Sequence, residues 1–530
     1  MVRSSSSSLS RAARRAGLRA GLGAVALASL AAVAGCSVGP DFKRPVKPTE
    51  AGYTPESLVP TTASAGVVDG GAAQTFNPGA DIPGQWWELY RSSELNGLID
   101  QALKANPDLD AAQASLRQAN ELLYAQQGTL FPTISANGQA QQQKFNGATT
   151  GQLIEPQVFG VTTGSLNIAY NPDVWGGTRR SVEAQAAQAE FQRFQLEATY
   201  LTLTSNVVVA AVNLASLRAQ IAATEDIIKS QTDSLRVVQT QFDLGGAARS
   251  DVLQQQATLT ATQAQLPPLQ KQLAQQRNQL MTLLGKPPTD DAGQGLRLQT
   301  LHLPEQLPLS LPSQLVEQRP DVRSAEAQLH TASANVGVAE AAQLPQFQIN
   351  GLWGVASLGL GTFLAPGSGV WSLGFSLAQT LIDGGQLEHK KLAAAAAYDK
   401  AAAQYRSTVL TAFQDVANAL RALQSDADTL KATVAAEQTA LASLNLAQQQ
   451  YQLGAVNYLT LLTAQQQYQT SLVNRVRAQG QRYADTAALF QALGGGWWNR
   501  TDVKPESKGK PYRYVNVPHV EDIKPPRAGH

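Results

Sequence analysis

Four short segments of the chain alternate apolar residues with small or polar ones at a period of two. Their ranges are 134–141, 165–170, 346–355 and 371–377. In the first segment Ile134 and Ala136 fall on one face, whereas Ser135 and Asn137 fall on the other. Such alternation over about 10 residues is typical of transmembrane barrel strands, whose apolar side chains face the lipid. A strand half-buried in a soluble sheet uses the same pattern.

The number of these strands constrains how they can assemble. The smallest membrane barrels have about 8 strands, so four strands cannot close one. An open sheet edge is not tolerated in lipid, because each unpaired backbone group there costs several kcal/mol. If the four strands span a membrane, several chains must therefore share one barrel.

Two long segments carry a helical period instead. Residues 178–241 form a stretch of 64 residues whose apolar positions, such as Leu203 and Val207, recur in alternating steps of four and three. The same seam runs from Val409 to Leu444 in the second half of the chain. A helix of that length spans about 96 Å, and a sustained heptad seam predicts coiled-coil packing. These helices are too polar for lipid, so they must cross an aqueous space comparable in depth to a periplasm.

The two halves of the chain repeat each other. The turn Phe242-Asp243-Leu244-Gly245 recurs as Tyr451-Gln452-Leu453-Gly454. The partner helices that return antiparallel from these turns are expected over residues 250–284 and 458–493. We expect two structural repeats, each with a helix, two strands, a long helix and a return helix, over 93–300 and 301–498. A soluble coiled-coil scaffold would explain the helices and leave the four alternating strands without a role.

The segments that flank the repeats lack a sustained period. Residues 36–92 are rich in Pro, Gly, Ser and Thr, and we expect an N-terminal linker that follows the surface. The first helical pattern then runs over 93–130. Residues 499–530 are expected to form an extended C-terminal tail.

The N-terminus has the form of an export signal. The apolar tract 21–34 is shorter than the roughly 20 residues that span a bilayer, and basic residues precede it. It ends at Val33-Ala34-Gly35-Cys36, as lipoprotein signals do, which predicts a leader over 1–35 and acylation of Cys36. An ordinary signal peptide with an incidental cysteine is the alternative. Ser37 follows the cysteine, whereas an Asp there would have favoured retention in the inner membrane.

Composition excludes several function classes. Charged residues make up 15% of the chain, below the roughly 25% of soluble domains. The formal net charge of +1 gives no reason to expect a nucleic-acid partner. The five histidines are scattered without a second metal ligand at useful spacing, and the lone cysteine is assigned to the lipid. We therefore expect neither an enzyme nor a cofactor.

An ordered series of short motifs resembles the TolC/OprM-like outer membrane factors, specifically the NodT-type efflux lipoproteins. The motifs are Cys36–Pro45, Trp86-Trp87-Glu88-Leu89-Tyr90, Val174-Trp175-Gly176-Gly177, Leu381-Ile382-Asp383-Gly384-Gly385 and the two aromatic-x-Leu-Gly turns. The resemblance spans about Cys36 to Trp498.

The resemblance implies an α+β membrane protein that forms a homotrimer in the outer membrane. Three chains of four transmembrane strands would give a 12-stranded barrel, continued by a periplasmic cylinder of antiparallel coiled-coil helices. Such proteins are passive exit ducts that receive small molecules from an inner-membrane efflux pump through a periplasmic adaptor. The alternatives are a duct for protein secretion and a structural scaffold. The lipoprotein start favours the small-molecule branch.

The resemblance also assigns roles near the two glycine turns. The family narrows its tube with two carboxylates, and the matching positions here are Thr460 and Thr463. A ring of hydroxyl groups neither repels itself nor attracts cations as crowded carboxylates do. Gly245 and Gly454 permit the left-handed turns, and the tips they form are expected to contact the adaptor.

A latch and an aromatic girdle complete the implied sites. In the family a tyrosine of the second turn bonds an aspartate of the first half, which corresponds to Tyr451 and Asp251. The alternatives are seam packing for Tyr451 and helix capping for Asp251. Trp353 and Trp371 fit an interfacial girdle, although packing within the sheet would explain them equally well.

Overall fold

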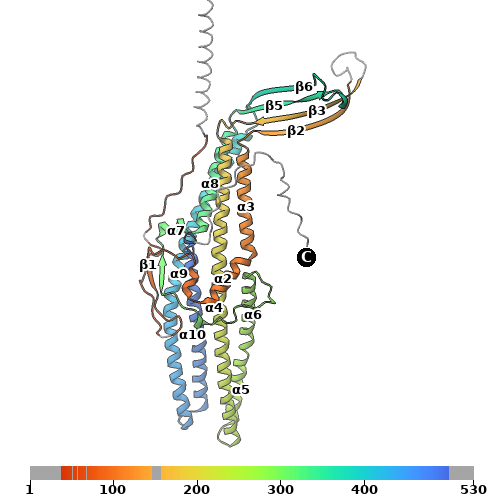
Figure 1. Ribbon diagram of the computed structural model, residues 1–530. Helices are drawn as coiled ribbons and strands as arrows, with labels where there is room; N and C mark the ends of the chain where they lie inside the picture. The colour runs from red at the N-terminus through yellow and green to blue at the C-terminus, as the bar shows by residue number, and fades with distance from the viewer. Residues whose placement is uncertain (1–36, 51, 57, 67, 146–156, 501–530) are drawn as a thin grey trace, which may run out of the picture.

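The computed structural model describes residues 37–500 except 51, 57, 67 and 146–156. Cys36, the leader 1–35 and most of the tail lie outside this part. The described chain is elongated, with a curved sheet at one end and helical hairpins pointing away from it (Figure 1). The longest helices, α4 (Gly177–Asp243) and α9 (Gln386–Gln452), each have 67 residues and span about 100 Å.

The sheet contains the four alternating segments. Its strands are β2 (Thr133–Phe145), β3 (Gln157–Tyr170), β5 (Gln346–Ser357) and β6 (Gly369–Ala378). They lie antiparallel in the order β2-β3-β5-β6, and Trp353 is aligned with Leu166 on one side and Trp371 on the other. The apolar positions therefore share one face. The β2–β3 pair is longer than the alternation suggested, because backbone pairing continues where Gln141 and its neighbours are polar on both faces.

Prolines divide the helices that the period alone had joined. The stretch 93–130 forms two helices, α2 (Ser93–Ala105) and α3 (Pro107–Gly128). Asn106 is extended and its side chain accepts hydrogen bonds from the amides of Asp108 and Leu109, which caps α3. The second half has the same break between α7 (Pro312–Gln318) and α8 (Pro320–Ala341). Helices α3 and α8 both contain 22 residues.

The return helices differ between the halves for the same reason. Residues 250–284 form α5 (Arg249–Gln263) and α6 (Leu266–Leu283), with Pro267 in the first turn of α6. Helix α10 (Tyr458–Ala492) contains no proline and is continuous.

The segment 36–92 is more than a surface linker, which corrects the prediction for its second part. Strand β1 (Thr75–Pro78) pairs in parallel with β4 (Gln306–Leu309) beside the helical body (Figure 1). The 3-10 helix η1 (Trp86–Tyr90) is buried, and Trp86 stacks on Phe490 at 5.1 Å. A four-residue strand and a single helical turn are too short to show a period. Other 3-10 helices in the described chain are η3 (Leu298–Thr300), η4 (Leu360–Thr362) and η5 (Trp497–Asn499).

The main core lies where η1, α2, α4, α9 and α10 meet. It is centred on α4 residues such as Val207 and Leu214, which are fully buried. Among the described residues, α4 alone is long and apolar enough to cross a membrane by composition, and 56% of its apolar window is buried inside the chain. This burial explains its apolar stretch as core packing.

Candidate functional site

The two hairpin tips have the same turn. At the end of α4, Gly245 has φ +78° and the amide of Gly246 donates to the carbonyl of Gln241 at 2.7 Å. At the end of α9, Gly454 has φ +70° and the amide of Ala455 donates to the carbonyl of Gln450 at 2.8 Å. These are Schellman-type turns that need glycine for its backbone freedom. The preceding residues of both turns, Leu244 and Leu453, are exposed.

Thr460 and Thr463, the predicted constriction residues, lie on the exposed face of α10. Asn457 caps this helix, and its side-chain oxygen accepts from both the amide and the hydroxyl of Thr460, at 3.0 and 2.9 Å. The Thr463 hydroxyl donates to the carbonyl of Leu459 at 2.8 Å. Both hydroxyl protons are thus used within the helix, which leaves only oxygen lone pairs facing outward.

A groove between α5 and α10 continues from these threonines. Its volume is about 570 Å³, and Arg477 is its one charged lining residue. The remaining polar positions carry amides or hydroxyls, namely Thr224, Gln254, Thr258, Thr262, Gln265, Thr463, Gln466, Gln469, Thr470 and Asn474. This surface hydrogen-bonds without strong charge. Across the described part of the chain, no group of three or more His, Cys, Asp or Glu residues could hold a metal ion.

The implied latch residues have other partners in this structure. The Tyr451 hydroxyl donates to Gln241 Oε1 at 3.0 Å rather than to Asp251. Asp251 instead accepts from the amide of Ala248 at 3.3 Å and so caps α5, which was the alternative for this residue. Burial, and secondarily the nearby Asp251 carboxylate, raise the pKa of the Tyr451 hydroxyl.

A second tyrosine forms a more deeply buried link that the sequence did not reveal. The Tyr458 hydroxyl donates to Gln255 Oε1 at 2.5 Å, and Gln255 Nε2 donates to the carbonyl of Gln231 at 3.0 Å. Gln255 is 0% exposed. The Tyr458 ring also packs edge-on against Tyr451 at 5.5 Å. These contacts join α10, α5 and α4, and we call them the tip network.

The tip network left little signal in the sequence. Tyr458 lies two residues before Thr460, so the sequence indicated a functional region at this position but not the role of the tyrosine itself. Gln255 stands in the run Gln254-Gln255-Gln256, where nothing distinguishes the inward-facing side chain.

The opposite end of the molecule exposes an apolar surface. Trp353 and Trp371 are adjacent on one face of the sheet and are 69% and 78% exposed. Neither ring is packed in the core of the chain, and Ile134 on the edge strand β2 is also exposed.

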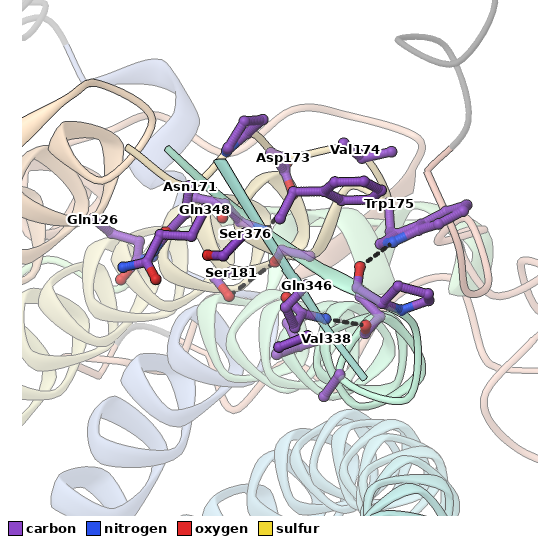
Figure 2. Close-up of a pocket in the computed structure, with 18 residues that line it drawn as sticks. Gln126, Asn171, Asp173, Val174, Trp175, Ser181, Val338, Gln346, Gln348 and Ser376 are labelled. Atoms are coloured by element: carbon purple, nitrogen blue, oxygen red, sulfur yellow. Dashed lines mark hydrogen bonds between the residues drawn. The ribbon is translucent and has the colours of Figure 1, made fainter. Parts of the chain in front are cut away.

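The junctions between sheet and helices differ sharply in burial. At the first junction Trp175 Nε1 donates to the carbonyl of Pro345 at 2.7 Å, and the ring packs against Phe347. Figure 2 shows this tryptophan beside a pocket of about 500 Å³ between the two repeats. At the second junction Leu381 and Ile382 are 86% and 93% exposed. The second junction therefore lacks, within one chain, the apolar neighbour that the first possesses.

Known proteins resemble this chain over nearly its full length. A family model described as outer membrane efflux protein matches residues 98–286 and 311–495. The pyoverdine export outer membrane protein OpmQ of Pseudomonas putida is 30% identical over 451 residues, which cover 83% of this chain and 94% of that protein. The toluene efflux pump outer membrane protein TtgC of Pseudomonas putida is 28% identical over 470 residues, or 88% and 94% of the two chains.

Solved structures agree with the sequence matches. The outer-membrane channel OprN superimposes with a TM-score of 0.78 at 27% identity, covering 87% of this chain and 100% of that one. The open state of the MtrE outer membrane channel of Neisseria gonorrhoeae gives a TM-score of 0.75 at 25% identity, covering 88% and 100%.

Proposed function

The chain belongs to the outer membrane efflux protein family and forms an outer-membrane efflux channel, and we propose that it does so as a homotrimer with one shared 12-stranded barrel. In this proposal the helices form a periplasmic cylinder that receives small organic molecules from an inner-membrane pump through a periplasmic adaptor. The relatives named for pyoverdine and toluene support this class of substrate. The duct itself is passive.

The open sheet is the observation that carries the proposal. Among the described residues, strands β2 and β6 each have one edge without a pairing partner, and the apolar face that includes Trp353 and Trp371 is exposed. Unpaired backbone groups are too costly in lipid for such a sheet to span a membrane alone. Pairing β6 of one copy with β2 of the next satisfies every edge once the ring closes.

The internal repeat supports a specific contact between copies. Within one chain the first repeat meets the second through β3–β5 pairing, α4–α8 packing and Trp175 on Phe347. If the ring continues this relation, the second repeat meets the first repeat of the next copy. Leu381 and Ile382, which directly precede the position that matches Trp175, then cover the exposed Ile134 of the neighbour.

The tips complete the proposed duct. Leu244-Gly245 and Leu453-Gly454 present the exposed turns that contact the adaptor's helical hairpins. Thr460 and Thr463 line the narrow entrance, and the tip network and the Tyr451–Gln241 bond hold it closed. Acylation at Cys36 adds an anchor to the barrel.

The oligomer can be tested with charge introduced at the second junction. Purified in detergent, the wild-type protein should have a protein mass of about 160 kDa, from three chains of 56.2 kDa less their 35-residue leaders. The Leu381→Glu/Ile382→Glu variant should dissociate, because carboxylates would be buried in the contact between copies. Leu360→Glu/Leu364→Glu is the matched control, since these leucines are equally exposed in the β5–β6 connection. A trimeric junction variant would contradict the proposed contact.

A further inference from the structure

The first described residues of the chain lie against the junction of sheet and helices. The amide of Val38 donates to the carbonyl of Trp175 at 3.0 Å, at the start of α4. From there the described residues of the N-terminal segment 37–56, which we call the strap, run along α8 and then α7 (Figure 1). Arg44 pairs with Glu326 at 3.0 Å, and Lys47 pairs with Glu317 at 2.7 Å. The family match begins at residue 98 and does not include the strap.

Arg180 holds the beginning of the strap. Its side chain is 6% exposed, and its Nε donates to the carbonyl of Val38 at 3.2 Å. Its Nη2 donates to Asp41 Oδ1 at 2.7 Å and to the carbonyl of Gly39 at 3.3 Å, while Nη1 donates to Glu183 Oε2 at 2.7 Å. A buried guanidinium is costly unless its donors are satisfied, and here the strap supplies three of the acceptors.

Close steric contacts of Gly39 and Phe42 supplement the hydrogen bonds and the ion pair that Arg180 makes with the strap. Gly39 has φ +89°, and a Cβ there would come within 2.3 Å of the Cα of Gly337 on α8. Phe42 stacks on His330 with ring centroids 4.2 Å apart and an interplanar angle of 13°. His330 Nε2 lies 2.9 Å from Glu183, which also pairs with Arg180. The strap is therefore held by the Arg180 guanidinium, by the ring of His330 and by close backbone packing against Gly337.

The residues that match Arg180 and Gly337 in the opposite repeats could not bind the strap. Counting from the paired Gly177 and Gly385, the residue in the position of Arg180 is Glu388. Counting along the equally long helices α3 and α8, Tyr124 stands in the position of Gly337. A carboxylate would repel the strap's carbonyl oxygens and Asp41, and a tyrosine would fill the space that Gly39 needs.

We propose that Arg180, Glu183, His330 and Gly337 form a docking site for the chain's own segment Ser37–Phe42. Each chain has one such site, on the first of its two junctions. Docking holds the N-terminal end of the strap at the helical rim of the sheet, while the Tyr53 hydroxyl, which donates to the carbonyl of Ser310 at 2.8 Å, holds its other end. A lipid on the preceding residue would then be attached at a set height beside the barrel. The site goes beyond the proposed channel activity and does not depend on it.

Trypsin gives a direct measure of docking. Within residues 37–90 the enzyme has one site, after Lys43, because Arg44 and Lys47 each precede a proline. Cleavage of a docked segment requires local release from its contacts. Intact mass measurements on the detergent-solubilised full chain would follow the appearance of a product that begins at Arg44.

Two variants with matched controls test the site. Arg180→Met removes the guanidinium. Its control is Arg236→Met, which breaks an exposed salt bridge with Asp233 on the same helix. Gly39→Ala blocks the approach to Gly337 without changing a helix. Its control is Gly52→Ala in the same strap, where a Cβ meets nothing within 4 Å. We expect each site variant to be cleaved about ten-fold or more faster than its control.

The outcomes decide the proposal either way. Equal cleavage of Gly39→Ala and Gly52→Ala would overturn it, and so would equal cleavage of a folded Arg180→Met and its control. If Arg180→Met does not fold, the glycine pair alone decides. Cys36→Ser should resist trypsin as the wild type does, because none of these contacts involves a lipid. Rapid cleavage of Cys36→Ser would show that the acyl group, not the Arg180 site, holds the strap.

Discussion

Tyr458→Phe removes one hydroxyl from the tip network and leaves the ring in place. In the wild type that hydroxyl donates to Gln255 Oε1, and Gln255 is fully buried. A buried acceptor left without its donor costs about 1–3 kcal/mol. If the bond exists only in the closed entrance, this loss shifts the balance between closed and open channels by about 5- to 150-fold. We therefore expect a marked increase in the open fraction.

The two other tyrosines of the tip region give a graded comparison. Tyr451→Phe also loses a hydrogen bond, to Gln241, but both residues are partly exposed and water can replace the donor. Its expected cost is about 0.5–1 kcal/mol, or a shift of about 2- to 5-fold. Tyr468→Phe is the control. Tyr468 lies on helix α10, as Tyr458 does, and its hydroxyl makes no hydrogen bond with the described residues.

Single-channel recording in planar lipid bilayers measures the open fraction of each variant. The expected order is Tyr458→Phe, then Tyr451→Phe, then Tyr468→Phe and the wild type. An open fraction of Tyr458→Phe equal to that of Tyr468→Phe would refute the role of the tip network in closure. Equal effects of Tyr458→Phe and Tyr451→Phe would show that burial does not determine how much each hydrogen bond stabilises the closed entrance.

Three further outcomes are expected. Thr460→Asp/Thr463→Asp would place six carboxylates around a trimer axis, so millimolar divalent cations should block its conductance and barely affect the wild type; strong block of the wild type would reveal another acidic ring. Cys36→Ser should remain a trimer in the membrane, and recovery as a soluble periplasmic protein would contradict the barrel. Burial and the neighbouring Asp485 raise the pKa of Asp426 to about 7, so the folded state retains a proton that the unfolded chain releases at lower pH. Stability should therefore fall as pH rises from about 4 to 7, and Asp426→Asn should flatten this dependence in thermal unfolding; an unchanged slope would contradict the assignment.

Local patterns in the sequence predicted the four strands of the large sheet, the two longest helices and the turns at their ends. The period of two located the four strands, and the heptad seam located α4 and α9, because each repeats over many residues. The period did not reveal the breaks at Asn106-Pro107 and Arg319-Pro320, where the missing amide hydrogen of proline and the restricted preceding residue end a helix. The sequence also predicted the turns at Gly245 and Gly454, since only glycine adopts their left-handed backbone conformation without steric cost.

Contacts between distant residues were decided by the tertiary structure alone. Strands β1 and β4 have four residues each and show no period, and their pairing joins residues 231 positions apart, as Thr75 and Gln306 are. The resemblance paired Tyr451 with Asp251, whereas in the folded chain Tyr451 donates to Gln241 and the neighbouring Tyr458 donates to Gln255. In the sequence Arg180 cannot be distinguished from an exposed helix residue, whereas in the structure the strap buries it. Sequence periodicity reports which face of an element is buried, whereas the partner on that face depends on how whole elements pack.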